Sequence, residues 1–260
     1  MPHMAADPMA LQSTIPARVD GTRLSDWSVA GAQADAPALS AVGSLAQALD
    51  SARHREAFYA FSKRALDLVV AAVLLLVLAP VFALVAIAIR LDGPGPIFYR
   101  GERVGRYGSR FNVVKFRSMR ADADPSAHCA FVRSLMQQSP TCTVYKVPDD
   151  PRITRVGAFL RKTSLDELPQ LWNVLRGEMS LVGPRPDVPY AVAEYSDWIH
   201  RRLLVKPGIT GLWQVSGRSR LSLMEMYRLD LAYVGAASLL FDLAILLRTV
   251  PVVLTRDGAA

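Results

Sequence analysis

Apolar residues are concentrated in one block of the chain, and the residues around that block limit how it can meet a membrane. Residues 68–89 carry no charge over 22 positions, and a straight helix of that length, about 33 Å, could cross a bilayer. Lys63 and Arg64 precede the block and five arginines follow it between residues 90 and 110, whereas a spanning helix keeps its positive excess on one side. Pro80 would bend the helix near its middle. The pattern favours a re-entrant helix that turns at this proline over a spanning helix, in which proline also occurs.

The rest of the pattern predicts a mostly α-helical body with one small β-hairpin. Residues 97–102 and 110–117 are expected to be its two strands. Helical spacing, a capping box at the start of the fourth segment and an interfacial amphipathic pattern in the last predict helices over 153–162, 165–176, 188–204, 223–234 and 239–254. The predicted fold class is a monotopic membrane protein with a flexible tail (1–52), a membrane re-entrant region (53–91) and a cytoplasmic catalytic domain (92–260). Within that domain, residues 121–150 are expected to form a helix and a loop.

Composition and charge narrow the classes of protein further. Hydrophobic residues make up 51% and charged residues 20% of the 260 positions, which excludes a disordered chain. The net charge is +7, and residues 1–52 contain five Asp, no Glu and two Arg, so the body is strongly basic. Such a body fits phosphorylated substrates, anionic lipid or nucleic acid. The uncharged block and the lack of a recognition module argue against nucleic acid. Cys129 and Cys142 are expected to be reduced thiols, and the four histidines have no zinc spacing.

Two adjacent carboxylates, Asp166 and Glu167, lie in the stretch richest in candidate chemistry. Six basic residues share that stretch: Arg152, Arg155, Arg161, Lys162, Arg176 and Arg185. Arginine binds phosphate oxygens in bidentate fashion, and Mg²⁺ takes one or two carboxylates plus phosphate oxygens, so this set suits a diphosphate substrate. The sequence Ser164-Leu-Asp-Glu167 is equally a helix-capping box, although Pro169 would loosen its first turn. The residues alone leave the catalytic and the capping interpretations open, and the arginines also fit lipid contacts.

Three basic residues in two places are candidates for phosphate binding. Lys115 and Arg117 alternate at the end of the second predicted strand, which would place both cations on one face. Charges at a protected strand edge explain them equally well. Arg185 stands between Pro184 and Pro186, which restrict its backbone and favour either a preorganised anion site or a simple turn.

Seven short motifs follow one another between Lys63 and Gly217: KRALD, DGPGPIF, KFRSM, DPRIT, LDELPQL, GEMSLVGPRP and KPGITGLWQVSG. Together they resemble the bacterial sugar transferases, the monotopic phosphoglycosyl transferases, over much of residues 58–254. Seven motifs in order make the resemblance highly specific, and it favours the catalytic interpretation of Asp166 and Glu167.

The resemblance implies an enzyme that transfers a sugar 1-phosphate from a UDP-sugar to undecaprenyl phosphate, releasing UMP, at the first membrane step of exopolysaccharide or surface glycan assembly. It implies that Asp166 is a nucleophile that forms a covalent phosphosugar intermediate, that Glu167 assists, and that Mg²⁺ is required, with Asp166 as its ligand. Substrate-binding residues are expected at Lys115, Arg117, Arg152, Arg155, Arg185 and Gln214. The apolar block would be a re-entrant helix bent at Pro80, in contact with the lipids of the bacterial inner (plasma) membrane, with the catalytic domain on its cytoplasmic face.

Some features depart from the family or stay open. Ala79 stands where the family often has Ser before the proline, and residues 235–237 replace an Asn-Trp pair. The first 50 residues are outside the resemblance, and no large multi-span N-terminal domain is expected. The C-terminal pattern resembles family members that act in exopolysaccharide synthesis with hexose donors, and this resemblance favours galactose or glucose as the sugar. The oligomeric state, a homodimer included, stays open. The alternative function is that of a catalytically silent membrane scaffold in polysaccharide assembly.

Overall fold

The structure is a computed structural model that describes residues 36–120 and 150–255. Contacts divide the chain into Met1–Arg53 and His54–Ala260, and all the candidate site residues belong to the second unit. Residues 1–35 of the expected tail lie outside the described residues, as does the helix and loop expected over 121–149 with both cysteines. The first helix begins at Ala36 and ends at Val77, so it includes residues 36–52 of the expected tail.

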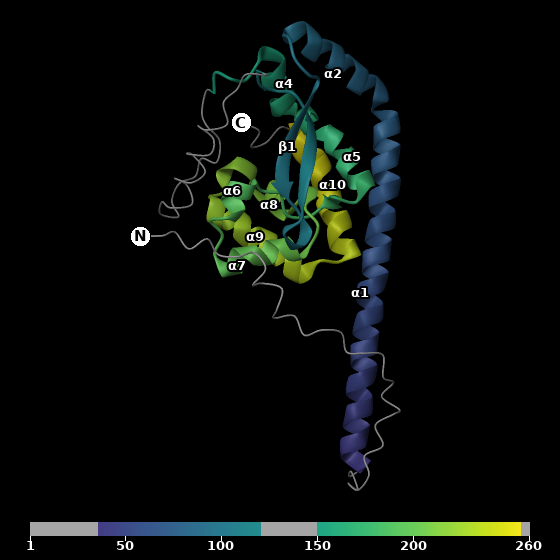
Figure 1. The fold of residues 1–260 in the computed structure, drawn as a ribbon. Helices are drawn as coiled ribbons and strands as arrows, with labels where there is room; N and C mark the ends of the chain where they lie inside the picture. Colours follow the sequence, from purple (N-terminus) through teal and green to yellow (C-terminus); the bar gives the residue numbers. More distant parts are fainter. Residues whose placement is uncertain (1–35, 121–149, 256–260) are drawn as a thin grey trace, which may run out of the picture. The chain divides into compact units, whose positions relative to one another are not determined.

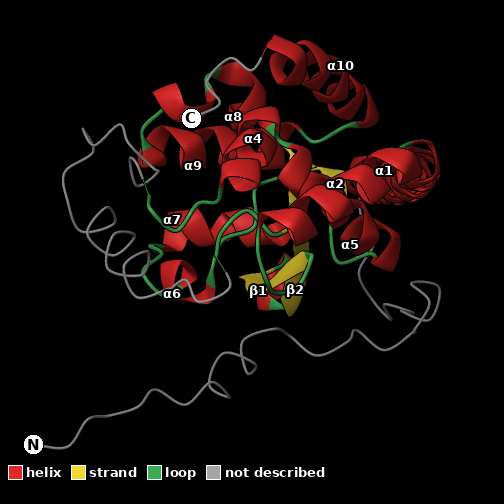
Figure 2. Ribbon diagram, turned by 90° about the horizontal axis from the view of Figure 1, so that it is seen from above, coloured by secondary structure: helices red, strands yellow, loops and turns green. Residues whose placement is uncertain are grey.

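Helices dominate the described residues, as the sequence predicts (Figures 1 and 2). The α-helices are α1 (Ala36–Val77), α2 (Ala79–Asp92), α4 (Arg155–Thr163), α5 (Leu171–Arg176), α6 (Pro189–Val192), α7 (Asp197–His200), α8 (Leu212–Ser216), α9 (Leu223–Ala236) and α10 (Leu239–Thr255). The 3₁₀ turns are η3 (Arg106–Gly108), η4 (Leu165–Gln170), η5 (Arg201–Leu204) and η6 (Arg218–Arg220). The strands are β1 (Phe98–Val104), β2 (Arg110–Phe116), β3 (Ser180–Val182) and β4 (Gly208–Thr210).

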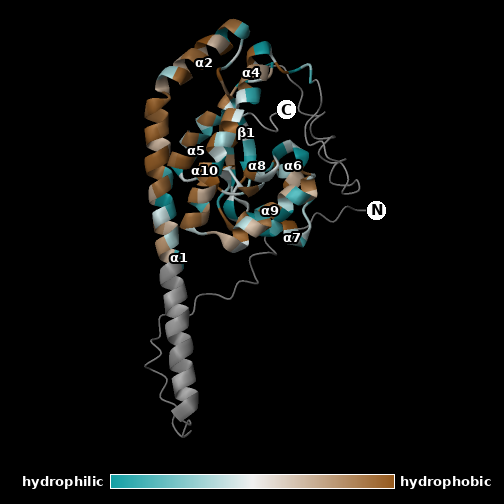
Figure 3. Ribbon diagram, turned by 180° about the vertical axis from the view of Figure 1, so that it is seen from behind, coloured by the Kyte–Doolittle hydropathy of each residue, from teal (hydrophilic) through white to brown (hydrophobic). Residues whose placement is uncertain are grey.

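The apolar block forms two helices that meet at the predicted proline. Pro80 lies in the first turn of α2, where its missing N–H would have no helical partner anyway. No single helix in the described residues is long and apolar enough to cross a membrane, but Glu56–Val77 and Ala79–Asp92, bent by 60°, pass that test as a pair. The predicted bend is confirmed. Figure 3 shows the hydrophobic colour running through the bend into α2, and Leu76 and Leu84 are 78% and 68% exposed.

Three polar residues of α1 bind other elements of the unit His54–Ala260. Lys63 Nζ forms a 2.8 Å salt bridge with Asp242 of α10, and the guanidinium of Arg64 donates to carbonyls at the end of α5. Asp67 accepts from the Ser180 hydroxyl and the Leu181 N–H, both in β3. Because positions four apart share a helix face, Lys63 and Asp67 can reach the same side of α1.

The predicted hairpin is confirmed, and a second strand pair was not predicted. β1 and β2 are antiparallel, with Lys115 opposite Tyr99. β3 and β4 pair in parallel, but three residues each are too few to show a period of two along the chain. A Cβ on Gly208 would overlap the backbone of Gly183, so glycine permits this close approach. The pair holds the start of the 183–187 loop beside β4.

The core joins the part of α1 around Ala71 to the strands and to α10. Its central side chains are fully or almost fully buried: Ala71, Val113, Val174, Met179, Val182, Tyr233 and Ile245. The helix expected over 188–204 is broken into α6, α7 and η5, because Ser196 takes an extended conformation (φ −76°, ψ 162°) and starts a new helix. The capping box of α9, between Ser222 and Glu225, is confirmed.

Candidate active site

Asp166 and Glu167 lie on the 3₁₀ turn η4 rather than on a regular α-helix. Ser164 ends α4 with a left-handed backbone (φ 59°), which sets η4 apart from the preceding helix. Pro169 inside the turn has no N–H to donate, so it cannot support a continuous α-helix there. With about three residues per turn, neighbouring side chains point roughly 120° apart. The two carboxylates therefore face different surroundings.

The capping interpretation of this pair is wrong. The side chain of Ser164 makes no capping hydrogen bond; only its backbone carbonyl accepts from the Glu167 N–H, at 3.2 Å. A capping box also needs the Glu side chain to turn back to the first residue. The Glu167 carboxylate instead points to groups from other elements.

Glu167 is held by three side chains. Lys115 Nζ lies 2.9 Å from Oε1, and Arg185 donates from Nη2 to Oε1 at 2.6 Å and from Nη1 to Oε2 at 3.3 Å. The amide of Gln170 donates to Oε2. Burial alone would raise the pKa of Glu167, but the charges of Arg185 and Lys115 hold it well below its ordinary range. Glu167 is therefore ionised at neutral pH, and both of its oxygens are engaged.

Asp166 is in the opposite situation. Its side chain is 8% exposed, and among the residues that the structure describes no hydrogen-bond donor reaches its carboxylate. Burial, assisted by the neighbouring charge of Glu167, raises the pKa of Asp166 to about 6, although Lys115 and Arg185 act to lower it. A nearly buried carboxylate beside two cations, which accepts no hydrogen bond from residues 36–120 or 150–255, is available to a ligand or a substrate.

The raised pKa of Asp166 predicts a pH dependence of stability. A carboxyl group whose pKa is higher in the folded than in the unfolded protein contributes stability that is present at low pH and lost as pH rises through the folded value. Asp230, whose burial also raises its pKa to about 6, acts in the same direction. In EDTA, the melting temperature should therefore fall between about pH 5 and pH 7, and it should fall less in Asp166→Asn protein. A wild-type melting temperature that rises over this interval would contradict the assignment.

Lys115 and Arg185 reach Glu167 from two different elements. Lys115 lies near the end of β2, and burial lowers the pKa of its ammonium group, against the attraction of Glu167. Arg185 lies in the 183–187 loop between two prolines, and its side chain is 29% exposed. Sequence reasoning predicted both as phosphate ligands, and the structure brings both beside the carboxylate pair. Their binding role itself stays a prediction.

Arg117, which was predicted to share a face with Lys115, has other partners than Glu167 in the structure. β2 ends at Phe116, and the Arg117 N–H still donates to the Ile97 carbonyl across the hairpin. Its guanidinium donates to the backbone carbonyls of Ile89, Gly93 and Pro94. These carbonyls belong to the end of α2 and the turn after it, where the last helical carbonyls lack intrahelical donors. Arg117 therefore connects β2 to α2 and has a structural role here.

Arg117→Met should destabilise the protein rather than change its chemistry. Removing the guanidinium leaves three carbonyls without their donor, which should cost on the order of 3 kcal/mol of unfolding free energy. The measurement is the melting temperature in detergent, with Arg100→Met as the matched control, because Arg100 is an exposed arginine on β1. If both variants melt alike while only Arg117→Met loses activity, the original substrate-binding prediction is correct.

The remaining predicted ligands lie in varied surroundings. Arg152 is bound to the carboxylate of Asp150 through Nε (2.8 Å) and Nη2 (2.7 Å), and this bond lowers the pKa of Asp150 to about 2. Arg155 is exposed in the first turn of α4. Gln214 donates to the Ile209 carbonyl, and its buried Oε1 has no hydrogen-bond partner in the described residues. None of the three contacts Glu167 directly among the described interactions.

Two residues that sequence reasoning missed support the turn. Gln170 is 2% exposed and holds Glu167; its signal was the spacing of three from Glu167, which places both on one side of a 3₁₀ turn. Arg218 Nη2 lies 3.1 Å from the Ser164 hydroxyl, just before the carboxylate pair. Nothing in the local sequence indicates this second contact, because 54 residues separate its partners.

The carboxylates fit a magnesium ion whose coordination a substrate completes. No group of three or more His, Cys, Asp or Glu side chains within the described ranges could hold a metal ion by itself. Mg²⁺ often binds through one or two carboxylates plus substrate phosphates, so a larger protein site is not required. Since both Glu167 oxygens are engaged, Asp166 is the carboxylate that remains for such an ion.

Comparison with known proteins identifies relatives over most of the described chain. A sequence model described as bacterial sugar transferase matches residues 58–256. The "UDP-galactose-lipid carrier transferase" of Erwinia amylovora is 46% identical over 199 residues, which cover 76% of this chain and 42% of the relative. The "Exopolysaccharide production protein ExoY" of Sinorhizobium fredii is 42% identical over 198 residues, covering 76% and 88%. The "UDP-glucose:undecaprenyl-phosphate glucose-1-phosphate transferase" of Caulobacter vibrioides is 43% identical over 205 residues, covering 76% and 71%. The matches span less than half the length of several relatives, 42% in the first case.

Proposed function

The chain belongs to the bacterial sugar transferase family, and we propose that it transfers a hexose 1-phosphate from a UDP-hexose to undecaprenyl phosphate. The products are undecaprenyl-diphospho-hexose and UMP. The observation that carries the proposal is the contrast between two adjacent carboxylates: both Glu167 oxygens are engaged, whereas Asp166 accepts no hydrogen bond from the described residues. The names of relatives that act on UDP-galactose or UDP-glucose support a hexose donor.

In the first step, an oxygen of Asp166 attacks the donor phosphorus that bears the sugar. The new bond joins that phosphorus to the carboxylate, and the bond to the bridging oxygen breaks, so that UMP leaves with this oxygen. Repulsion between a carboxylate and an anionic diphosphate opposes this attack. Lys115 and Arg185, both beside Glu167, reduce that repulsion and stabilise the negative charge that develops on the leaving phosphate.

In the second step, a phosphate oxygen of the lipid attacks the same phosphorus. The bond from phosphorus to Asp166 breaks, and the free carboxylate is restored. Splitting the reaction lets one site serve a water-soluble donor and a lipid acceptor in turn. Glu167 keeps Lys115 and Arg185 in place through both steps.

A bound Mg²⁺ would supply further neutralisation of the donor diphosphate. Asp166, the carboxylate that no side chain of the described residues engages, would be the protein ligand that holds it. Asp166 cannot act as a nucleophile while it is protonated, so the enzyme needs its ionised form at the working pH.

The bent helix pair in residues 56–92 brings the site to the membrane surface in this proposal. It enters the bilayer from the cytoplasmic side, turns at Pro80 and returns to that side of the inner membrane. The exposed apolar residues of α10, among them Leu240, Leu247 and Leu254, would rest in the interface.

Cysteine labelling tests this topology. In protein whose two native cysteines are replaced by Ser, Ser62→Cys and Tyr99→Cys should both react in inverted vesicles, and neither should react in intact cells with an impermeant reagent. The reason is that both ends of the bent pair lie on one side. Reaction of the two positions from opposite sides would contradict the re-entrant topology. Pro80→Ala, which restores a backbone donor and helps the helix straighten, should move Tyr99→Cys toward the opposite side, where it is labelled in intact cells.

A donor panel tests the activity. With Mg²⁺ and undecaprenyl phosphate, the purified protein should release UMP from UDP-galactose or UDP-glucose. Without the lipid, UMP release should stop after one turnover. A scaffold, the alternative function, would release no UMP from any donor while remaining folded and membrane-bound. That result would reject the proposed transferase.

A further inference from the structure

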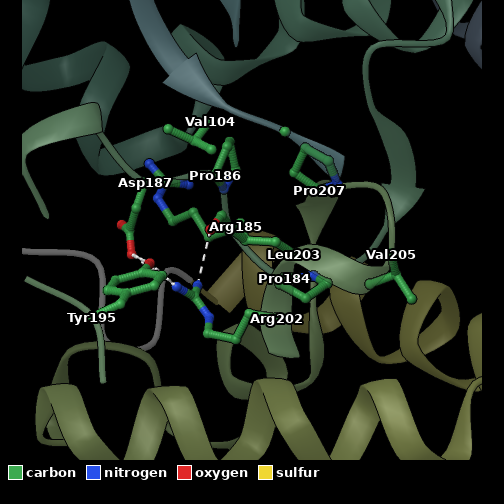
Figure 4. A pocket seen from close by; sticks show the side chains of 11 residues that line it. Val104, Pro184, Arg185, Pro186, Asp187, Tyr195, Arg202, Leu203, Val205 and Pro207 are labelled. Carbon is green, nitrogen blue, oxygen red and sulfur yellow. Dashed lines mark hydrogen bonds and ion pairs between the residues drawn. The ribbon is translucent and has the colours of Figure 1, made fainter. Parts of the chain in front are cut away.

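A buried polar cluster lies directly behind the loop that carries Arg185. It consists of Asp187, Tyr195, Arg202, Tyr227 and Asp230, each at most 8% exposed. Figure 4 shows the Arg202 side chain pointing toward Arg185 and toward Tyr195 and Asp187, with dashed lines marking these contacts. Neither step of the proposed reaction uses any of these five side chains.

Arg202 is the centre of this cluster. Its Nη1 lies 2.8 Å from Asp187 Oδ2, and its Nε lies 2.8 Å from Asp230 Oδ2 in α9. Its Nη2 donates to the backbone carbonyl of Arg185 at 3.0 Å. The guanidinium also lies over the ring of Tyr227, 4.4 Å from its centre. One planar group thus holds two points of the 183–187 loop against α9.

Stability alone gives little reason for such a cluster. The cost of burying charges commonly offsets their attraction, so a well-packed apolar substitute is often as stable. An apolar group could not reproduce the directional hydrogen bonds of an arginine. The fork of donors on an arginine fixes the angle and the distance of each partner at once.

The neighbouring contacts show why the 183–187 loop needs the directional hydrogen bonds of Arg202. Three backbone hydrogen bonds surround Arg185. The N–H groups of Gly183, Val104 and Gly208 donate to the backbone carbonyls of Thr210, Asp187 and Pro184, respectively. These bonds hold the loop on both sides of Arg185. Pro186 supplies no N–H, and the Arg185 carbonyl is the point that Arg202 holds. The far end of the same residue reaches Glu167 at 2.6 Å.

We propose that Arg202 is a positioning residue for Arg185: through the Arg185 carbonyl and the Asp187 carboxylate it sets the point from which the Arg185 side chain meets Glu167 and the donor phosphate. The proposal rests on the proposed function for the role of Arg185 in catalysis. Asp230 holds Arg202 from behind, and the hydroxyls of Tyr195 and Tyr227 hold Asp187. The cluster acts on the reaction only through Arg185.

A double-mutant cycle tests this dependence. Arg202→Lys keeps the charge but loses the fork, and misplacement of Arg185 should lower kcat/KM by about 100-fold. In an Arg185→Ala background the same change should cost about twofold or less, because the residue it positions is gone. Arg201→Lys, the exposed neighbour in η5, should change neither background. If Arg202→Lys costs the same factor with and without Arg185, the cluster is only structural and the proposal is overturned.

Two further measurements keep the outcome clear. If Arg202→Lys does not fold, Asp230→Asn should lower kcat/KM by about tenfold with Arg185 present and by about twofold or less without it. A structure of either variant tests the positioning of Arg185 without a measurement of turnover. The Arg185 guanidinium should lie farther from Glu167 than in the wild type. An unchanged contact between Arg185 and Glu167 would overturn the proposal. Absence of UMP release from every wild-type reaction would reject the proposed function, whereas the structure of the variant would still decide whether Arg202 positions Arg185.

Discussion

Asp166→Asn should lower turnover of the UDP-sugar by at least about 10⁴-fold, because an amide oxygen is a poor nucleophile and removal of a nucleophile costs several orders of magnitude. The folded protein should survive the change. The Asp166 carboxylate accepts no hydrogen bond from the described residues, and replacing it removes a buried charge next to Glu167. The measurement is UMP release alongside the melting temperature.

Asp197→Asn is the matched control, since Asp197 is exposed in the first turn of α7. It should keep wild-type turnover. A folded Asp166→Asn protein with substantial turnover would exclude Asp166 as the nucleophile. Loss of folded protein in parallel with activity would point to a structural carboxylate instead.

Lys115→Met should lower kcat/KM by about 10²- to 10³-fold, the usual effect of removing one group that stabilises a developing negative charge. The variant should still fold, because Arg185 and Gln170 continue to hold Glu167 and the methionine fills a similar volume. The measurement is kcat/KM for the donor, compared with the fraction of protein that stays folded and membrane-bound.

The exposed Lys162 near the end of α4 supplies the control. Lys162→Met removes the same charge from the same chain and should change kcat/KM by less than about threefold at moderate ionic strength, where separated surface charges are screened. Equal losses in the two variants would mean that overall charge, not the position of Lys115, matters.

The sequence was sufficient where a local pattern determines the outcome. The uncharged block with Pro80 predicted the bend. Two short strand-like segments on either side of a turn predicted the β1–β2 hairpin, and the spacing of Ser222 and Glu225 predicted the cap of α9. Each of these depends on residues close together in the chain. The adjacent carboxylates were found for the same reason.

The sequence was insufficient where partners come from distant segments. Ser164 and Glu167 have the right spacing for a capping box. The Glu167 carboxylate instead binds Lys115 and Arg185, which lie 52 and 18 residues away in the chain. Arg117 follows Lys115 by two positions in the sequence, but its guanidinium donates to carbonyls at and just after the end of α2. The β3–β4 pair and the contact of Arg202 with Arg185 likewise depend on tertiary proximity that no local period records.

The most direct test is the intact mass of wild-type protein incubated with the UDP-hexose and Mg²⁺ but no lipid. A covalent route through Asp166 predicts a species heavier by one hexose phosphate, absent in Asp166→Asn protein and lost when undecaprenyl phosphate is added. Wild-type protein that turns over with lipid yet never carries the adduct, even after rapid quenching, would contradict that route. It would leave direct transfer in one step, with Asp166 as a metal ligand.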